Sequence, residues 1–197
     1  MQSLRERIVA DGVTVGTDTV KVDSFLNHQI DVRFFEELAR GFSMRFADLE
    51  PGSVDKILTV ESSGIAVATF TAREFGYPPV VFAKKDLPST MTEDYWFTEI
   101  MSFTKSKMTA IRIAKKYLQA GERVLIIDDF LAHGQAASGL VRLCAEAGCE
   151  LLGVGAVIEK QFQGGATLLA REGVRVESLA VIERIEDGRI HFAEGRA

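Results

Sequence analysis

Runs of consecutive aliphatic residues recur along the chain, and segments with helical periodicity lie between them. The runs that predict buried strands are Lys56–Val60, Pro78–Ala83, Val124–Ile127 and Leu151–Ile158. Apolar residues three and four positions apart predict helices over about Asp31–Phe46, from Gly64 to about Phe75, and over Gln135–Gly148. Strands that alternate with helices in this order predict an α/β fold with a doubly wound parallel sheet.

Weaker signals complete the pattern toward the two ends of the chain. The first residues predict a short amphipathic helix that ends at Asp11-Gly12. Farther along, Gly164-Gly165 opens a helix over about Ala166–Glu172, and Val174–Leu179 predicts a last core strand. Asp187-Gly188 is a strong hairpin signal between two predicted strands, Val181–Ile185 and Arg189–Phe192.

Three segments lack a clean period. Residues 19–31 mix apolar residues with Asn27, His28 and Gln29, which fits a lid over a polar aromatic ligand or a surface loop with an Asx-turn. Residues 84–107 carry clustered aromatics and charges, which predicts a mobile hairpin whose return strand spans about Ile100–Lys105. Residues 109–119 are compatible with a short helix or with a pair of strands.

Composition limits the classes of protein that the chain can represent. Its 197 residues fit one domain, taken as 1–197, and 47% hydrophobic residues are enough to build a core. A net charge of −5 argues against a general nucleic-acid binder, which normally presents a basic surface. The chain has neither an apolar run of membrane-spanning length nor a signal peptide. We therefore expect a cytoplasmic protein with no nucleic-acid and no membrane partner.

The strongest chemical signal follows the run Val124–Ile127. Two carboxylates, Asp128 and Asp129, are followed by a turn of small residues around Gly134 and by a helix that starts at Gln135. A helix N-terminus offers unpaired N–H groups to a phosphate, and glycine lets the backbone approach it closely. Carboxylates repel a phosphate but accept hydrogen bonds from the hydroxyls of an attached ribose. The stretch predicts a phosphate–sugar site; an Asp that caps a loop or binds Mg²⁺ in another doubly wound protein is the alternative.

Other polar groups also follow predicted strands. They are Glu61–Gly64, Lys84-Lys85 and Glu159-Lys160. Ligands of doubly wound sheets bind outside the carboxyl ends of the strands, so we expect these groups to surround the same site as the acidic pair. Each lysine taken singly is equally compatible with solvated surface charge.

The acidic pair and its loop resemble the phosphoribosyl-diphosphate (PRPP) binding motif of the type I phosphoribosyltransferases. Many members carry Thr where this chain has Gln135. The resemblance is closest to the xanthine phosphoribosyltransferases of bacterial purine salvage, and it extends over nearly the whole chain. The segments that carry it are Lys21–Asp31, Glu61–Ala66, Ser102–Lys105, Val124–Gly139 and Val157–Gln163.

The resemblance implies a fold of the type I kind, with a small hood and a flexible lid hairpin, and a homodimer. It implies transfer of the phosphoribosyl group of PRPP to xanthine, which yields xanthosine 5′-monophosphate and diphosphate. Mg²⁺ is expected through the diphosphate of PRPP, with no metal site built from protein ligands alone.

The resemblance also assigns roles by position. The catalytic residues at the ribose are Asp128 and Asp129, and the contacts to xanthine are Val20, Asn27 and Lys160. The PRPP-binding residues are Glu61, Ser62, Ser63 and Gly64 at the diphosphate, Lys84 and Lys105, and Ala132, His133, Gly134, Gln135 and Ala136 at the 5′-phosphate. His133 can add a charge-assisted bond to that phosphate or face solvent.

Two alternatives belong to the same fold. A purine-sensing repressor carries a winged-helix domain before the fold, whereas here the pattern begins almost at Met1 and the net charge is acidic. Sister transferases act on adenine, on orotate, or on hypoxanthine and guanine, and only the base pocket separates them from an enzyme for xanthine.

Overall fold

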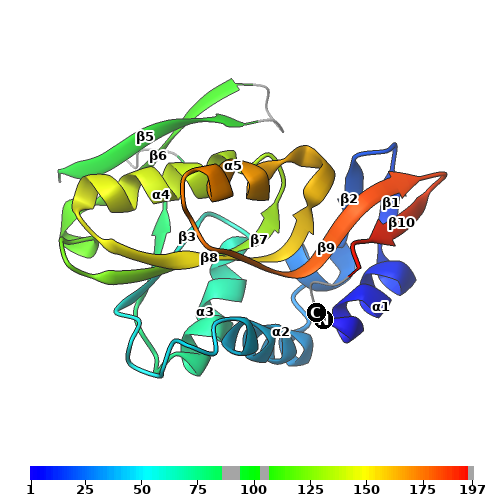
Figure 1. Cartoon of the computed structure of the whole chain (residues 1–197), viewed down its shortest axis with the longest axis horizontal. Coiled ribbons are helices and arrows are strands. Elements are labelled where there is room, and N and C mark those ends of the chain that lie inside the picture. Colours follow the sequence, from blue (N-terminus) through cyan, green and yellow to red (C-terminus); the bar gives the residue numbers. More distant parts are fainter. Residues whose placement is uncertain (86–93, 103–106, 195–197) are drawn as a thin grey trace.

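A six-stranded sheet forms the centre of the computed structural model, which describes residues 1–85, 94–102 and 107–194 (Figure 1). The strand order is β10-β9-β8-β7-β3-β4, and neighbours run parallel except that β10 is antiparallel to β9. The predicted α/β fold with a mainly parallel sheet is thus confirmed. The strands are β3 (Lys56–Val60), β4 (Val80–Ala83), β7 (Arg123–Leu131), β8 (Glu150–Lys160), β9 (Val176–Glu186) and β10 (Arg189–Phe192).

Helices cover both faces of this sheet. In Figure 1, α2 (Val32–Arg45) and α3 (Gly64–Glu74) lie below it, and α4 (Gln135–Ala147) and α5 (Gly165–Arg171) lie above it. These bounds confirm the helices that the apolar periodicity predicts. No helix within the described ranges is long and apolar enough to cross a membrane.

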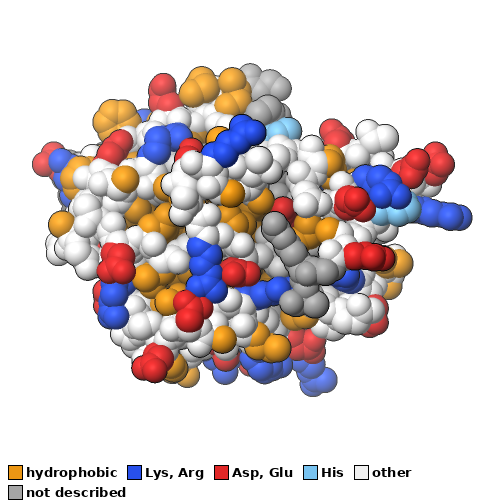
Figure 2. Space-filling view, viewed as in Figure 1, with side chains coloured by type: hydrophobic (Ala, Val, Ile, Leu, Met, Phe, Trp, Pro, Cys, Tyr) orange, Lys and Arg blue, Asp and Glu red, His pale blue; other side chains and the backbone are white. Residues whose placement is uncertain are grey.

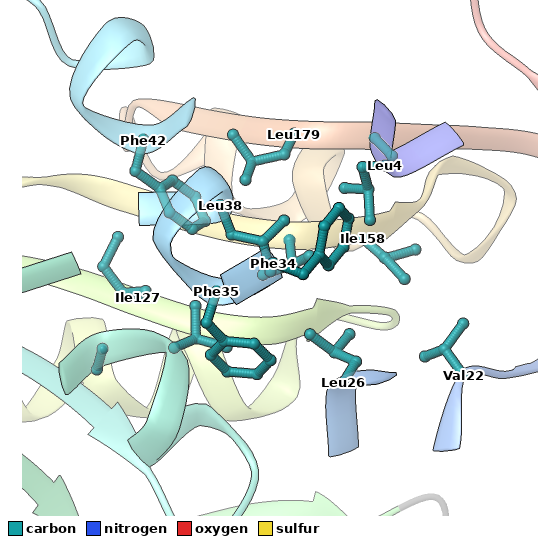
Figure 3. Packing of buried hydrophobic residues seen from close by; sticks show 14 of the residues in the cluster. Leu4, Val22, Leu26, Phe34, Phe35, Leu38, Phe42, Ile127, Ile158 and Leu179 are labelled. Atoms are coloured by element: carbon teal, nitrogen blue, oxygen red, sulfur yellow. The ribbon is translucent and has the colours of Figure 1, made fainter. Parts of the chain in front are cut away.

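Each face of the sheet buries its own hydrophobic cluster. Figure 3 shows the cluster under α2, where Phe35 and Phe42 pack with Ile127 of β7. On the opposite face, Leu140 of α4 packs with Ile126, the neighbouring residue on β7. The aliphatic run before the acidic pair is therefore buried on both sides, which holds the end of β7 in a fixed position.

Small elements form a hood beside the end of the sheet where β9 and β10 pair. They are α1 (Gln2–Asp11), the hairpin of β1 (Val13–Val15) and β2 (Thr19–Lys21), and a short π-helix (Asp23–Asn27). The helix α1 and its end before Gly12 are confirmed. The segment 19–31, which the sequence left open, is thus a strand followed by a π-helix and a short connection to α2.

A second hairpin lies over α4 and consists of β5 (Tyr95–Ser102) and β6 (Lys107–Ala114). The hairpin is confirmed, but the expected return strand over Ile100–Lys105 is wrong, because the outgoing strand extends to Ser102 and the return strand begins at Lys107. Segment 109–119, for which the sequence allows a helix or strands, contains the end of β6 followed by the 3₁₀-helix Lys115–Tyr117. Gly139 of α4 permits the close packing, since a Cβ atom there would lie 2.6 Å from Ile100 Cγ2.

The last strand also differs from the expectation. Two strands, Val174–Leu179 and Val181–Ile185, are predicted, whereas β9 is continuous from Val176 to Glu186. No turn residue separates the two halves, so backbone pairing with β8 continues to Ile182 while the far end of β9 pairs with β10. The predicted Asp187-Gly188 turn between β9 and β10 is confirmed. The 3₁₀-helix Gln161–Gln163 connects the neighbouring β8 to α5.

Candidate functional site

The acidic pair lies near the end of β7, inside the strand rather than after it. Asp128 and Asp129 are buried, with exposed fractions of 7% and 9%. The backbone N–H of Asp129 donates a hydrogen bond to Asp128 Oδ1 at 3.0 Å. Burial raises the pKa of Asp128 well above its usual range, and the adjacent charge of Asp129 raises it further. The two carboxyl groups are therefore poorly hydrated at the carboxyl edge of the sheet, and the negative form of Asp128 is disfavoured there.

The loop between β3 and α3 touches this pair directly. A Cβ atom on Gly64 would lie 2.3 Å from Asp128 Oδ1 and 2.2 Å from Thr59 Oγ1, so the position accommodates only glycine without a shift. Glu61, at the start of this loop, accepts a hydrogen bond from the backbone N–H of Lys85 at 2.6 Å through Oε1, and its peptide bond to Ser62 is cis. The loop Glu61–Gly64 thus packs against Asp128 through Gly64.

The turn after β7 is braced from a different direction. Gly134 has a φ of +77° at the N-cap of α4, and a Cβ atom on it would lie 2.9 Å from Gly165 Cα. The N–H of Gly165 donates to the carbonyl of Ala132 at 3.0 Å. Among the described residues, no side chain forms a capping hydrogen bond at the start of α4, where a helix offers its first N–H groups. Backbone-to-backbone contact with the start of α5 thus holds the loop Ala132–Ala136 in shape.

Lys160 ends β8, the strand next to β7. Its ammonium donates to the carbonyl of Asp18 at 2.8 Å and lies 5.6 Å from the centre of the Phe130 ring. Asp18 belongs to the turn of the hood hairpin, so this bond connects the sheet edge to the hood. Burial lowers the pKa of Lys160, and the charge of Asp18 partly opposes that shift. A partly desolvated donor therefore stands beside a flat aromatic surface.

The other two residues expected at the base lie in the hood. Val20 is buried on β2, two residues after Asp18. Asn27 ends the π-helix and is exposed, whereas its neighbour Leu26 is buried in one cluster with Ile158 of β8 (Figure 3). The hood thus brings the segment of Asn27 toward the end of the strand that carries Lys160.

Comparisons with known proteins agree with this geometry. Residues 23–184 match the family described as phosphoribosyl transferase domain. The xanthine phosphoribosyltransferase of Clostridioides difficile is 48% identical over 192 residues, which is 98% of this chain and 100% of the relative. That of Laribacter hongkongensis is 46% identical with the same two coverages. This chain belongs to the phosphoribosyltransferase family.

Solved structures of this family share the fold at low sequence identity. The adenine phosphoribosyltransferase of Rhodothermus marinus superimposes with a TM-score of 0.72 at 21% identity, covering 92% of this chain and 100% of that one. The adenine phosphoribosyltransferase of Trypanosoma brucei reaches 0.73 at 18% identity, covering 90% and 78%. This phosphoribosyltransferase is accordingly a transferase with the α/β fold of the family.

The structure brings most of the predicted site residues of this phosphoribosyltransferase to one edge, and their individual roles stay predictions. Asp128 is in contact range of Gly64, Gly134 is braced by Gly165, and Lys160 is tied to the hood. Lys84 directly follows β4, and its ammonium lies 6.0 Å from the ring of Phe82 on that strand. Lys105 lies outside the described residues. His133 lies in the turn after β7.

Two residues near the site, Phe130 and Gly165, are absent from the positions that the resemblance assigns, whereas Lys85 belongs to the groups expected at this edge. Phe130 directly follows the acidic pair and pairs with Ile158 on β8. Its ring therefore lies beside Lys160, two residues farther along β8, which the sequence alone does not show. Lys85 contributes positive charge at Asp128 and opposes the rise of its pKa. Gly165 supports the turn at Gly134, and the adjacent Gly164 in the sequence is a signal for such a close approach.

Proposed function

We propose that this protein transfers the phosphoribosyl group of PRPP to xanthine and releases diphosphate. The observation that carries the proposal is the partly desolvated ammonium of Lys160. Lys160 ends β8, the strand next to the acidic pair, and its ammonium lies beside the ring of Phe130. Relatives named xanthine phosphoribosyltransferase, at 46–48% identity over nearly the whole chain, support the same base. The family and the geometry thus favour one reaction.

In this reaction the bond between C1′ and the diphosphate oxygen breaks, and its electron pair leaves with the diphosphate. A ring nitrogen of xanthine forms the new bond to C1′, and its proton passes to solvent directly or through the released diphosphate. Positive charge develops on the ribose as the diphosphate departs. Asp128 and Asp129 accept hydrogen bonds from the ribose hydroxyls and oppose that charge from a site that excludes most water.

The two loops divide PRPP between them. Ala132–Ala136 takes the 5′-phosphate, because glycine at 134 and the uncapped start of α4 present backbone N–H groups there. Glu61–Gly64 takes the diphosphate, since this loop meets Asp128 at the other side of the ribose. Lys85, which acts electrostatically on Asp128, joins Lys84 and Lys105 as a candidate to neutralise the departing diphosphate.

Mg²⁺ would enter with PRPP, bound through its diphosphate. In the described parts of the chain, no group of three or more His, Cys, Asp or Glu side chains is placed to hold a metal ion. The carboxylates of Asp128 and Asp129 are oxygen donors of the kind that Mg²⁺ prefers, and they suit an ion whose other ligands come from substrate and water. Bound Mg²⁺ would neutralise part of the diphosphate charge.

The base lies between the sheet edge and the hood. Lys160 donates to the C6 oxygen of xanthine, Asn27 donates to the C2 oxygen through its amide, and Val20 lines the pocket. Phe130 offers its ring as a flat surface. The amine of guanine at C2 would meet a donor instead of an acceptor, and the amine of adenine at C6 would face an ammonium.

A panel of bases with PRPP and Mg²⁺ tests the assignment through nucleotide formation. We expect xanthine to be used first, guanine and hypoxanthine far less, and adenine not at all. A site built to bond a substrate group rejects an analogue that lacks it by about 10⁴-fold, because the polar groups of the site remain unpaired. Comparable use of adenine or orotate, or a preference for hypoxanthine or guanine over xanthine, contradicts the proposal.

We also propose that the protein is a cytoplasmic homodimer of single-domain subunits 1–197. The outer face of the β5–β6 hairpin supports the dimer, because it exposes 60% of Phe97, 39% of Met101 and 52% of Met108. Figure 2 shows hydrophobic side chains along the top of the view, over this hairpin. Glu99 and Arg112 stand on the same face. A twofold interface needs such a self-complementary patch, since each charge can meet its opposite on the second copy.

Sedimentation of the wild type and two charge variants tests the dimer. Met108→Lys should shift the protein toward the monomer, because it places a charge in the apolar part of the face. Met44→Lys is the matched control, as Met44 is 78% exposed on α2, away from the hairpin. A wild-type monomer, or equal behaviour of the two variants, excludes this face as the interface.

A further inference from the structure

The π-helix that carries Asn27 is held by a residue far from the base pocket. Its Phe25 is fully buried and packs edge-on against Phe34 of α2, with ring centres 5.7 Å apart and an interplanar angle of 84°. The guanidinium of Arg7, on α1, lies 5.2 Å from the Phe25 ring centre and 5.6 Å from that of Phe34. One arginine thus covers both rings of the pair.

The same arginine also fixes the chain on the far side of Asn27. Arg7 Nη1 pairs with Asp31 Oδ2 at 3.3 Å, and Arg7 Nε pairs with Asp11 of its own helix. Asp31 caps α2, because its Oδ1 accepts a hydrogen bond from the Phe34 N–H at 3.1 Å. The N–H of Asp31 donates to the carbonyl of Phe25 at 3.3 Å. Phe25 and Asp31 bracket Asn27, and Arg7 contacts both.

The bracketed residues have little support of their own. Asn27, His28 and Gln29 are exposed, and backbone bonds from the N–H groups of His28 and Gln29 to the Asp23 carbonyl, at 2.8 Å for Gln29, close the turn. An exposed turn keeps one conformation only if its ends are fixed, since each freed residue regains conformational entropy. Figure 3 shows the Phe34 ring directed toward Ile158, near the end of β8 that leads to Lys160.

From this geometry we infer that Arg7 is a positioning residue for base selection. Through Phe25 and Asp31, Arg7 fixes the turn 27–29 near the end of β8, where Lys160 lies. The inference rests on the proposed function of Asn27 as the donor to the C2 oxygen. Arg7 touches neither substrate; it determines how accurately the Asn27 amide meets the base. A lysine cannot replace it fully, because an ammonium pairs with Asp31 but does not spread over two rings.

A double-mutant cycle tests the inference. Arg7→Met keeps the apolar stem and removes the guanidinium, and it should lower the xanthine-to-hypoxanthine ratio of kcat/KM by roughly tenfold, since misplacement by about 1 Å can cost up to 10²-fold. The loss should come from KM for xanthine, with KM for PRPP unchanged. In an Asn27→Ala background, Arg7→Met should leave the ratio where Asn27→Ala has put it, because residues that act as a unit are not additive.

Two further variants separate this role from a loss of stability. Arg73→Met removes the ion pair, at 2.9 Å, between Arg73 on α3 and Glu36 on α2, the helix that Asp31 caps. This variant should leave the base ratio unchanged. Arg7→Lys should fall between the wild type and Arg7→Met, and it carries the cycle if Arg7→Met fails to fold. Hydrogen exchange of the amides 23–31 should quicken in the Arg7 variants and not in Arg73→Met.

The outcomes separate the positioning role of Arg7 from the transferase activity itself. An unchanged base ratio in the Arg7 variants, or an equal loss in both backgrounds, overturns the positioning role while the transferase assignment stands. A wild type that does not use xanthine overturns the proposed function instead, and the exchange rates of residues 23–31 then show whether Arg7 still holds the turn.

Discussion

Gly64 lies against Asp128 so closely that a Cβ atom added at residue 64 would stand 2.3 Å from Oδ1 of the carboxylate. The residues come from different strand–loop–helix units, and Thr59 Oγ1 closes the same space at 2.2 Å from that added atom. The loop Glu61–Gly64 and Asp128 therefore cannot move independently. A change in one displaces the other.

Gly64→Ala tests this contact. The added methyl group must push either the loop or the Asp128 carboxylate aside, so we expect kcat/KM to fall by about 10²-fold, the usual result of a displacement near 1 Å. Gly41→Ala is the control, because a Cβ atom there would meet only side-chain atoms of Met1 and Leu179, at 3.0 Å or more, and no carboxylate of the site. Steady-state kinetics with circular dichroism decide the question, and normal activity in a folded Gly64→Ala protein contradicts the close contact.

The acidic pair should contribute to catalysis through charge. Asp128→Asn combined with Asp129→Asn keeps the shape and removes both negative charges that oppose the positive ribose. Loss of one such electrostatic contact costs about 2.7–4 kcal/mol of transition-state stabilisation. We expect turnover to fall by orders of magnitude with the fold intact. Near-normal turnover in the folded double variant would falsify the ribose assignment.

Asp128 should reduce the stability of the folded protein at neutral pH. Burial raises the folded-state pKa of Asp128, so the stability that its protonated form contributes is complete below the unfolded-state pKa and is lost as pH rises through the folded-state pKa. Asp128→Asn should therefore raise the free energy of unfolding at pH 7, because an amide has no charged form for burial to disfavour. Urea unfolding at pH 4 and pH 7 should show the gain at the higher pH only.

The pKa of Asp55 is shifted in the direction opposite to that of Asp128. Hydrogen bonds from Arg123 lower the pKa of Asp55 to about 2, so its contribution is present above the unfolded-state pKa and is lost as pH falls toward 2. Asp55→Asn should lower stability at pH 7. If Asp128→Asn and Asp55→Asn shift the urea midpoint at pH 7 in the same direction, the electrostatic account of one of them is wrong.

The two base contacts should separate in a substitution experiment. Asn27→Ala removes the donor to C2, the position at which xanthine and hypoxanthine differ, and should reduce the preference for xanthine. Lys160→Ala removes the donor to C6, an oxygen that all 6-oxopurines share, and should weaken them together. Kinetics on xanthine, hypoxanthine and guanine measure both effects. An unchanged xanthine-to-hypoxanthine ratio in Asn27→Ala would show that residue 27 does not select the base.

Local patterns in the sequence determined the architecture and the edge at which the site lies. Apolar runs with periodic segments between them specify strands and helices, because side-chain direction repeats every two residues in a strand and about every 3.6 in a helix. Parallel strands place their carboxyl ends together, so Glu61–Gly64, Asp128-Asp129 and Lys160 could be assigned to one edge before any distance was known. The sequence did not predict where β5 ends and β6 begins, or that β9 is continuous. Pairing with neighbouring strands decides both features.

Only the tertiary structure decided which of these residues touch. The contact of Gly64 with Asp128, the brace of Gly165 on Gly134 and the bond from Lys160 to Asp18 join segments that are far apart in the chain. The pKa shifts of Asp128 and Lys160 belong to the same category, because burial causes them and burial is a property of the packed chain. The position of Arg7 over Phe25 and Phe34 shows this most clearly, since an arginine in an amphipathic helix reveals nothing of the rings that folding places beneath it.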